Sequence, residues 1–135
     1  MIIGTGIDIV ELARIRSILQ RQEDAFLTRI LTQGERARIP GASARRIEYI
    51  AGRYAAKEAL SKALGTGIGG SFSFQDAEII VENSGKPAIA MNDAQLESIT
   101  GQRGCTLHVS ISHSEQYAIA HVIVEKREDL SAYRQ

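Results

Sequence analysis

Two charged side chains, Glu58 and Lys62, stand one helical turn apart in a stretch rich in Ala and Leu. The same predicted helix has an apolar stripe, which consists of Ile47, Ile50, Ala51 and Tyr54. Continued along the helix, this stripe reaches Glu58, where another apolar residue would be expected. A carboxylate on a core-facing stripe is costly unless a cation or hydrogen-bond donors compensate it. The helix alone favours a simple ion pair between Glu58 and Lys62, and the alternative is a metal-holding carboxylate with a lysine beside it for phosphate.

A second carboxylate, Asp8, belongs to a glycine-rich strand face. Residues 2–10 alternate as a β-strand, with Gly4, Gly6, Asp8 and Val10 on one face. Two glycines leave open space beside the carboxylate, which a ligand or a second backbone would fill. The alternative is close strand or helix packing, with Asp8 as the N-cap of the next helix.

Composition limits the classes of function. The chain has 135 residues, which fits a single domain over residues 1–135 with a real core. Its formal net charge of +0 argues against broad electrostatic binding of nucleic acid or membrane. The single cysteine, Cys105, excludes an internal disulfide and suits a reducing cytoplasm. The start of the chain lacks the basic segment of a signal peptide, and no apolar run is long enough to span a bilayer.

Two predicted helices position the charged residues. Ser43 is a plausible N-cap and Gly65 a stop signal, so the helix carrying Glu58 is predicted to run from Ser43 to Leu64. A helix over 11–22 has a second face on which Arg14, Ile18 and Arg21 alternate basic and apolar character. A solvated surface explains such arginines most simply, and docking of an acidic amphipathic partner is the alternative.

The remaining segments complete an α+β pattern. Helical continuation is predicted over 24–31, a capping box at Thr32–Glu35 opens a short helix, and Asn92 or Asp93 caps a helix reaching about Thr100. Strands are predicted over 72–82, 87–91, 105–112 and 117–125, and the charged tail from Lys126 is expected to fray. This order indicates an antiparallel sheet packed against a long helix and shorter helices.

Three pieces of the chain together resemble the 4′-phosphopantetheinyl transferase family, in particular its short bacterial type. They are Gly4-Thr5-Gly6-Ile7-Asp8-Ile9, the run from Gly52-Arg53-Tyr54 through Lys57-Glu58 to Lys62, and His108-Val109-Ser110-Ile111-Ser112-His113. Tyr54 stands where the wider family often has Phe or Trp. The resemblance implies transfer of the phosphopantetheine arm of coenzyme A to a serine of apo acyl carrier protein, with release of adenosine 3′,5′-bisphosphate, in fatty acid biosynthesis.

The resemblance also implies roles for individual residues. Asp8 and Glu58 are expected to hold Mg²⁺, and Lys62 to contact the diphosphate and assist the departing oxygen. Coenzyme A contacts are expected from Arg45, Arg53, Lys62, Gly65, Thr66 and His108. Two alternatives stay open for the group that accepts the serine proton. One is Glu58 acting through a water, and the other is a carboxylate of the carrier.

The implied partners are the carrier and further copies of the chain. Arg14, Ile18 and Arg21 become the expected docking face for the acidic carrier. The short members form trimers with sites between subunits, so Asp8 and Glu58 are expected to meet His108 or Arg45 across a boundary. The rival hypothesis is a non-catalytic nucleotide-binding or assembly module in which Glu58 and Lys62 form a structural pair.

Overall fold

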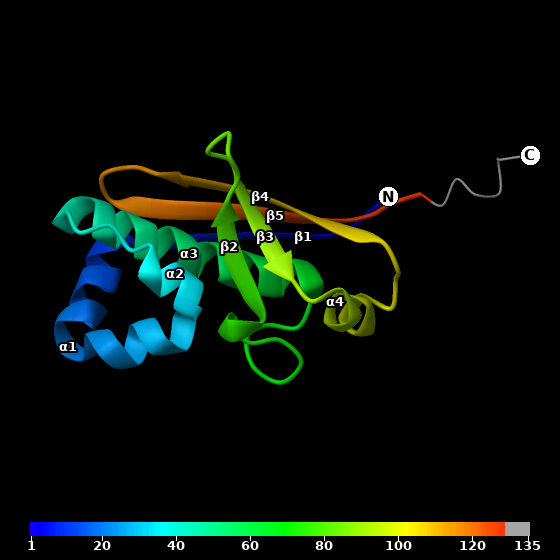
Figure 1. Cartoon of the computed structure of the whole chain (residues 1–135), viewed down its shortest axis with the longest axis horizontal. Coiled ribbons are helices and arrows are strands. Elements are labelled where there is room, and N and C mark those ends of the chain that lie inside the picture. The colour runs from blue at the N-terminus through cyan, green and yellow to red at the C-terminus, as the bar shows by residue number, and fades with distance from the viewer. Residues whose placement is uncertain (129–135) are drawn as a thin grey trace, which may run out of the picture.

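A three-stranded antiparallel sheet forms one layer of the computed structural model, which describes residues 1–128. Its strands are β1 (Ile2–Glu11), β5 (Tyr117–Lys126) and β4 (Cys105–His113), in the order β1-β5-β4 (Figure 1). The central strand buries Ala118, Ala120, Val122 and Val124, which is the face that alternation predicts. Lys126 belongs to β5 and its amide donates to the Met1 carbonyl at 2.8 Å, so the predicted fraying does not begin there, and most of the predicted tail lies outside the described residues.

Helix α3 (Ser43–Leu64) covers the inner face of this sheet. A Cβ added to Gly6 would lie 1.9 Å from the Ala59 carbonyl oxygen, and one added to Gly4 would lie 2.0 Å from that of Ala63. Gly65 ends the helix as predicted, with φ of 77°.

The N-cap predicted for α3 is wrong, and the alternative role of Asp8 as an N-cap is excluded. The residue at the N-cap of α3 is Ala42, which makes no side-chain capping hydrogen bond, so Ser43 is already inside the helix. Glu11, rather than Asp8, occupies the N-cap of α1 (Leu12–Ile30). Asp8 lies within strand β1, and its side chain does not cap a helix.

Helices α1 and α2 (Gln33–Ala37) lie together at one end of α3 (Figure 1). Gln22 has non-helical angles and divides α1 into two helical pieces, in agreement with the separate predictions over 11–22 and 24–31. The Thr32–Glu35 capping box opens α2 as predicted. The sharp change of direction brings the second piece of α1 alongside α3.

A separate two-stranded ribbon follows the glycine loop. It consists of β2 (Ala77–Val81) and β3 (Pro87–Met91), and α4 (Asp93–Thr100), capped by Asn92, leads on to β4. The strand predicted over 72–82 is too long, because Ser73 and Asp76 form a capping box that folds Phe74–Asp76 into a 3₁₀ turn, η1. The α+β class is confirmed, with the strands divided between two antiparallel sheets.

Candidate active site

Asp8 and Lys62 meet where β1 crosses α3. The Lys62 ammonium donates to the Asp8 carboxylate oxygen Oδ1 and to the Ile7 carbonyl, at 3.1 Å each. The Asp8 side chain is 17% exposed and that of Lys62 is 53% exposed, so the pair opens toward solvent. Lys62 thus pairs with an acid 54 positions away, instead of forming the i, i+4 pair with Glu58 that the helix alone favours.

Glu58 lies on the same side of α3, half-buried, one turn before Lys62. The Tyr54 hydroxyl shows which groups gather there. Burial raises the pKa of Tyr54, the Glu58 carboxylate raises it further, Asp8 adds to the rise, and Arg14 on α1 opposes it. The Tyr54 hydroxyl is therefore within electrostatic reach of two carboxylates, one on β1 and one on α3, and of an arginine on α1.

This donor set fits a magnesium ion. Mg²⁺ prefers oxygen ligands and usually keeps several waters, taking one or two protein carboxylates together with substrate phosphates. Asp8 and Glu58 supply two carboxylates beside an open face. Within residues 1–128 no cluster of three or more His, Cys, Asp or Glu side chains suited to a metal is found.

The loop after α3 lies directly beyond Lys62. The amides of Thr66 and Gly67 both donate to the Ser61 carbonyl, at 3.1 and 3.2 Å, which folds the loop back over the last turn. The Thr66 hydroxyl donates to the Gly67 carbonyl at 2.8 Å. Gly65 and Thr66 are thus brought to the same end of α3 as Lys62.

Three residues predicted to contact the nucleotide lie elsewhere in the chain. Arg45 is exposed in the first turn of α3. Its separation from Lys62 along the helix axis is about 25 Å, at a rise of about 1.5 Å per residue. Arg53 lies over the Tyr49 ring, 3.9 Å from its centroid, and burial lowers its pKa. His108 is exposed on β4 and pairs with Glu125 at 3.0 Å. Each is separate from the Asp8–Lys62 pair, so one copy does not assemble the whole predicted set around that pair.

The predicted docking face is formed by the first piece of α1. Arg14 and Arg21 are exposed, and Ile18 between them is half-buried against the core. Arg14 is within electrostatic reach of the Tyr54 hydroxyl, as Asp8 and Glu58 are.

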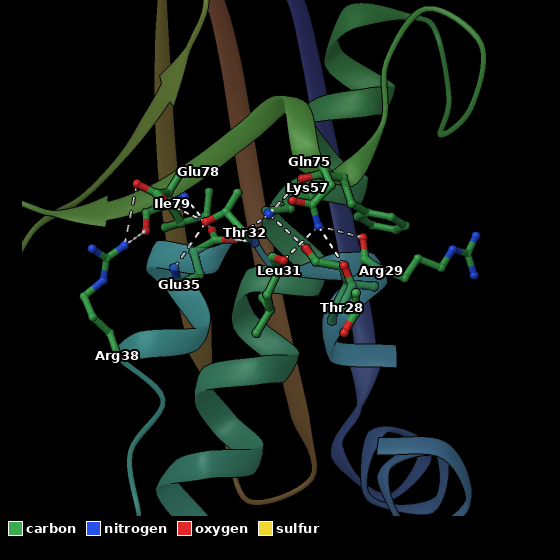
Figure 2. Close-up of polar contacts among 12 residues, drawn as sticks. Thr28, Arg29, Leu31, Thr32, Glu35, Arg38, Lys57, Gln75, Glu78 and Ile79 are labelled. Atoms are coloured by element: carbon green, nitrogen blue, oxygen red, sulfur yellow. Dashed lines mark hydrogen bonds and ion pairs between the residues drawn. The ribbon is translucent and has the colours of Figure 1, made fainter. Parts of the chain in front are cut away.

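Figure 2 shows a buried ion pair between Lys57 and Glu35, two residues that are not among the site candidates predicted from the sequence. The Lys57 ammonium donates to Glu35 at 2.6 Å and to the carbonyls of Ile30 and Phe74 at 2.9 Å each, with both charged side chains fully buried. Burial lowers the pKa of Lys57 and the Glu35 carboxylate opposes this shift. Three full donations satisfy the ammonium, so the pair acts as an anchor among α1, α2, α3 and η1.

The Glu35–Lys57 pair had only a weak signal in the sequence. Lys57 lies within an Ala-rich stretch of its helix, but its partner lies 22 positions away and already has a local explanation as a capping residue. The Glu35 carboxylate also accepts from the Ile79 amide at 2.6 Å, a contact that depends on the position of β2.

Comparison with known proteins agrees with this fold. The family model described as the 4′-phosphopantetheinyl transferase superfamily matches residues 4–122. The chain belongs to this superfamily, a class of group-transferring enzymes. Within the superfamily it is an enzyme of the holo-[acyl-carrier-protein] synthase group.

Both sequence relatives and solved structures support this placement. The holo-[acyl-carrier-protein] synthase of Geobacillus kaustophilus is 52% identical over 127 residues, covering 93% of this chain and 91% of the relative. The crystal structure of the Bacillus anthracis holo-(acyl-carrier-protein) synthase in complex with CoA (3′,5′-ADP) has a TM-score of 0.80 and 44% identity, covering 94% of this chain and 99% of that one. The Neisseria meningitidis enzyme has a TM-score of 0.83 and 38% identity, covering 93% and 100%.

Proposed function

We propose that this chain, as a single transferase domain, moves the 4′-phosphopantetheine group of coenzyme A to a serine of apo acyl carrier protein with the help of Mg²⁺. The observation that carries this proposal is the contact of Lys62 with Asp8, which lie on two elements far apart in the sequence, with Glu58 one helical turn before Lys62. Relatives named for the same activity and a neighbour solved with coenzyme A support it. We place the reaction in fatty acid biosynthesis in the cytoplasm.

The proposed roles follow from the chemistry of the side chains. Asp8 and Glu58 would hold the ion, which would neutralise the diphosphate when bound. The carrier serine gives its proton to Glu58 through a water or to a carboxylate of the carrier, and its oxygen forms a bond to the β-phosphorus. The bond from that phosphorus to the bridging oxygen breaks, and adenosine 3′,5′-bisphosphate leaves with that oxygen. Lys62, already held over Asp8, would place its positive charge where the leaving oxygen becomes negative.

We also propose that the site is completed in a homotrimer. Ile7 and Ile9 are 57% and 60% exposed on the face of the sheet opposite α3, and Tyr117 lies exposed on the adjoining strand. An apolar sheet face of this kind is typical of an interaction surface. The separation of Arg45, Arg53 and His108 from Asp8 within one copy supports their contribution to a neighbour's site.

The carrier would dock on α1. Arg14 and Arg21 present positive charge around Ile18, which complements an acidic amphipathic surface. Because Arg14, Asp8 and Glu58 are all within electrostatic reach of the Tyr54 hydroxyl, a carrier bound there would bring its serine toward the diphosphate.

A carrier-modification assay tests the proposal. The protein is incubated with coenzyme A, Mg²⁺ and apo acyl carrier protein, and the carrier is followed by mass spectrometry for addition of the phosphopantetheine arm. Asp8→Ala and Glu58→Ala should abolish the addition, while Glu115→Gln, in the exposed turn between β4 and β5, should retain it. Absence of any addition, over a range of bacterial carriers, would reject the proposal. Coenzyme A binding that is indifferent to EDTA in calorimetry would favour the non-catalytic rival.

A further inference from the structure

The C-terminal end of α1 is capped by side chains from two other elements, Gln75 of η1 and Lys57 of α3 (Figure 2). We propose that Gln75 is a positioning residue for the carrier, because this cap fixes where the docking face of α1 lies relative to α3. The inference rests on the proposed function, since it takes docking of the carrier on α1 as given. Gln75 acts through α1 rather than on a substrate.

Four consecutive carbonyls at this end of α1 receive no amide of the helix itself. The Leu31 amide is the last to bond back, to the Leu27 carbonyl at 3.0 Å. The next amide, that of Thr32, donates instead to the Glu35 carboxylate at 2.8 Å, within the capping box of α2. The carbonyls of residues 28–31 therefore need donors from elsewhere, and the helix dipole places partial negative charge on this end.

Gln75 and Lys57 supply these donors. The side-chain nitrogen of Gln75 lies within hydrogen-bond distance of three carbonyl oxygens, those of Leu31 at 2.8 Å, Thr28 at 2.9 Å and Arg29 at 3.3 Å. An amide group has two N–H bonds, so the two shorter contacts are full donations and the third is shared. The Lys57 ammonium donates to the remaining carbonyl, that of Ile30, at 2.9 Å. All four carbonyls are thereby bonded.

The cap joins α1 to the elements that carry the site. Lys57 also donates to the carbonyl of Phe74, the residue directly before Gln75, at 2.9 Å, so the two donors hold each other in place. Lys57 directly precedes Glu58 in α3, and η1 follows the glycine loop that begins at Gly65. One small network therefore connects the end of α1, the helix of the site and the segment beyond the loop.

The cap bears on the docking face because α1 is divided. Gln22, with φ of −154° and ψ of 56°, separates the first piece, which carries the docking face, from the capped second piece. Arg21 directly precedes this break, so the place where the docking face ends depends on where the second piece lies. The second piece buries Phe26, Leu27 and Ile30, but apolar packing is non-directional. The directional hydrogen bonds of the cap fix its rotation and its position along its axis.

Three variants isolate the cap from the packing around it. Gln75 is exposed, so Gln75→Met removes both N–H donors without emptying a buried space. Gln33→Met is the matched control, because Gln33 is also exposed and lies in the first turn of the neighbouring α2. Gln75→Lys restores hydrogen-bond donors, and a cation is favourable at the C-terminal end of a helix.

The carrier-modification assay is run on the full-length chain with carrier and coenzyme A varied in turn. We expect Gln75→Met to raise the KM for carrier about fivefold and to change the KM for coenzyme A by less than about twofold. Gln33→Met should change neither constant. Gln75→Lys should return the KM for carrier to within about twofold of normal at both low and high salt, since attraction of the carrier to the added charge would fade with salt.

Arg21→Glu, in the docking face itself, separates this inference from the proposed function. If Arg21→Glu raises the KM for carrier and Gln75→Met does not, the positioning role alone is overturned. An equal rise in Gln33→Met, an equal rise of both constants in Gln75→Met, or a Gln75→Lys rescue that is lost at high salt would also overturn it. So would unfolding of Gln75→Met at the assay temperature, because the cap would then serve stability. If Arg21→Glu leaves the KM for carrier unchanged, the docking face is wrong and the inference falls with it.

Discussion

At the scale of single residues, Lys62 has a position that stability does not explain. Its side chain is more than half exposed, and an exposed ion pair contributes on the order of 0–1 kcal/mol. Its ammonium nevertheless contacts both Asp8 and the carbonyl of the residue before it. We therefore expect the contact to serve the placing of a positive charge beside Asp8 more than the stability of the fold.

We expect Lys62→Ala to lower kcat about 10²–10³-fold, because the charge that stabilises the leaving oxygen would be lost. The free energy of unfolding should change by less than about 1 kcal/mol, because the pair is exposed. Steady-state carrier modification and urea unfolding measure the two quantities. Arg36→Ala removes another exposed cation, which donates to the Thr28 hydroxyl at 3.3 Å, and should alter neither strongly. A large loss of stability in Lys62→Ala would show that the residue is structural instead.

At the scale of elements, the site depends on the close contact of β1 with α3. The Gly6 Cα faces the Ala59 carbonyl so closely that no side chain fits between strand and helix. Asp8 lies two residues along the same strand, on the same face. The distance between Asp8 and the helix that carries Glu58 and Lys62 is thus set by a glycine.

Gly6→Ala should lower both stability and activity. An added methyl group would have to push β1 away from α3, which costs about 1–3 kcal/mol or more and moves Asp8. Gly41→Ala is the matched control, because an added Cβ there meets nothing within 4 Å and its φ is not positive. It should leave activity unchanged and stability equal or slightly higher. Thermal unfolding and the carrier assay give both readouts, and a fully active, stable Gly6→Ala protein would contradict the close contact.

The Lys57–Glu35 pair joins further elements behind the site. Lys57→Met should destabilise the protein by about 3–5 kcal/mol, because it leaves the Glu35 charge buried and unpaired. Arg103→Met removes the cation of an exposed pair, with Glu97, and should cost no more than about 1 kcal/mol. Urea unfolding measures both. A double-mutant cycle with Glu35→Gln should show strong coupling, and additive effects would argue against a buried pair.

Local patterns predict elements better than they predict contacts. The alternation of residues 117–125 and the Gly65 stop signal are confirmed because burial on one face and a left-handed cap are local properties. The strand over 72–82 is too long because a Ser73–Asp76 capping box competes with extended backbone. The pairing of Lys62 with Asp8 could not be predicted from the helix, since it depends on how a distant strand crosses it.

At the scale of the whole molecule, the predicted site residues divide into two groups. Asp8, Glu58 and Lys62 gather in one copy, whereas Arg45 and His108 lie apart from them. The apolar outer face around Ile7 and Ile9 offers a surface on which another copy could pack. A site shared across a subunit boundary would reconcile both observations. It would also explain why the residues predicted to contact coenzyme A do not all lie beside Asp8 in one copy.

Mixing two inactive variants tests a shared site. Asp8→Ala should lack the carboxylate pair, and His108→Ala should bind coenzyme A poorly, so each alone should modify carrier slowly. If Asp8 and His108 come from different subunits, unfolding and refolding an equal mixture should restore up to about one quarter of the normal rate, because a quarter of randomly formed boundaries receive both intact residues. Each variant refolded alone is the control. A mixture no faster than the average of the two separate proteins would place both residues in the same subunit's site or remove His108 from it.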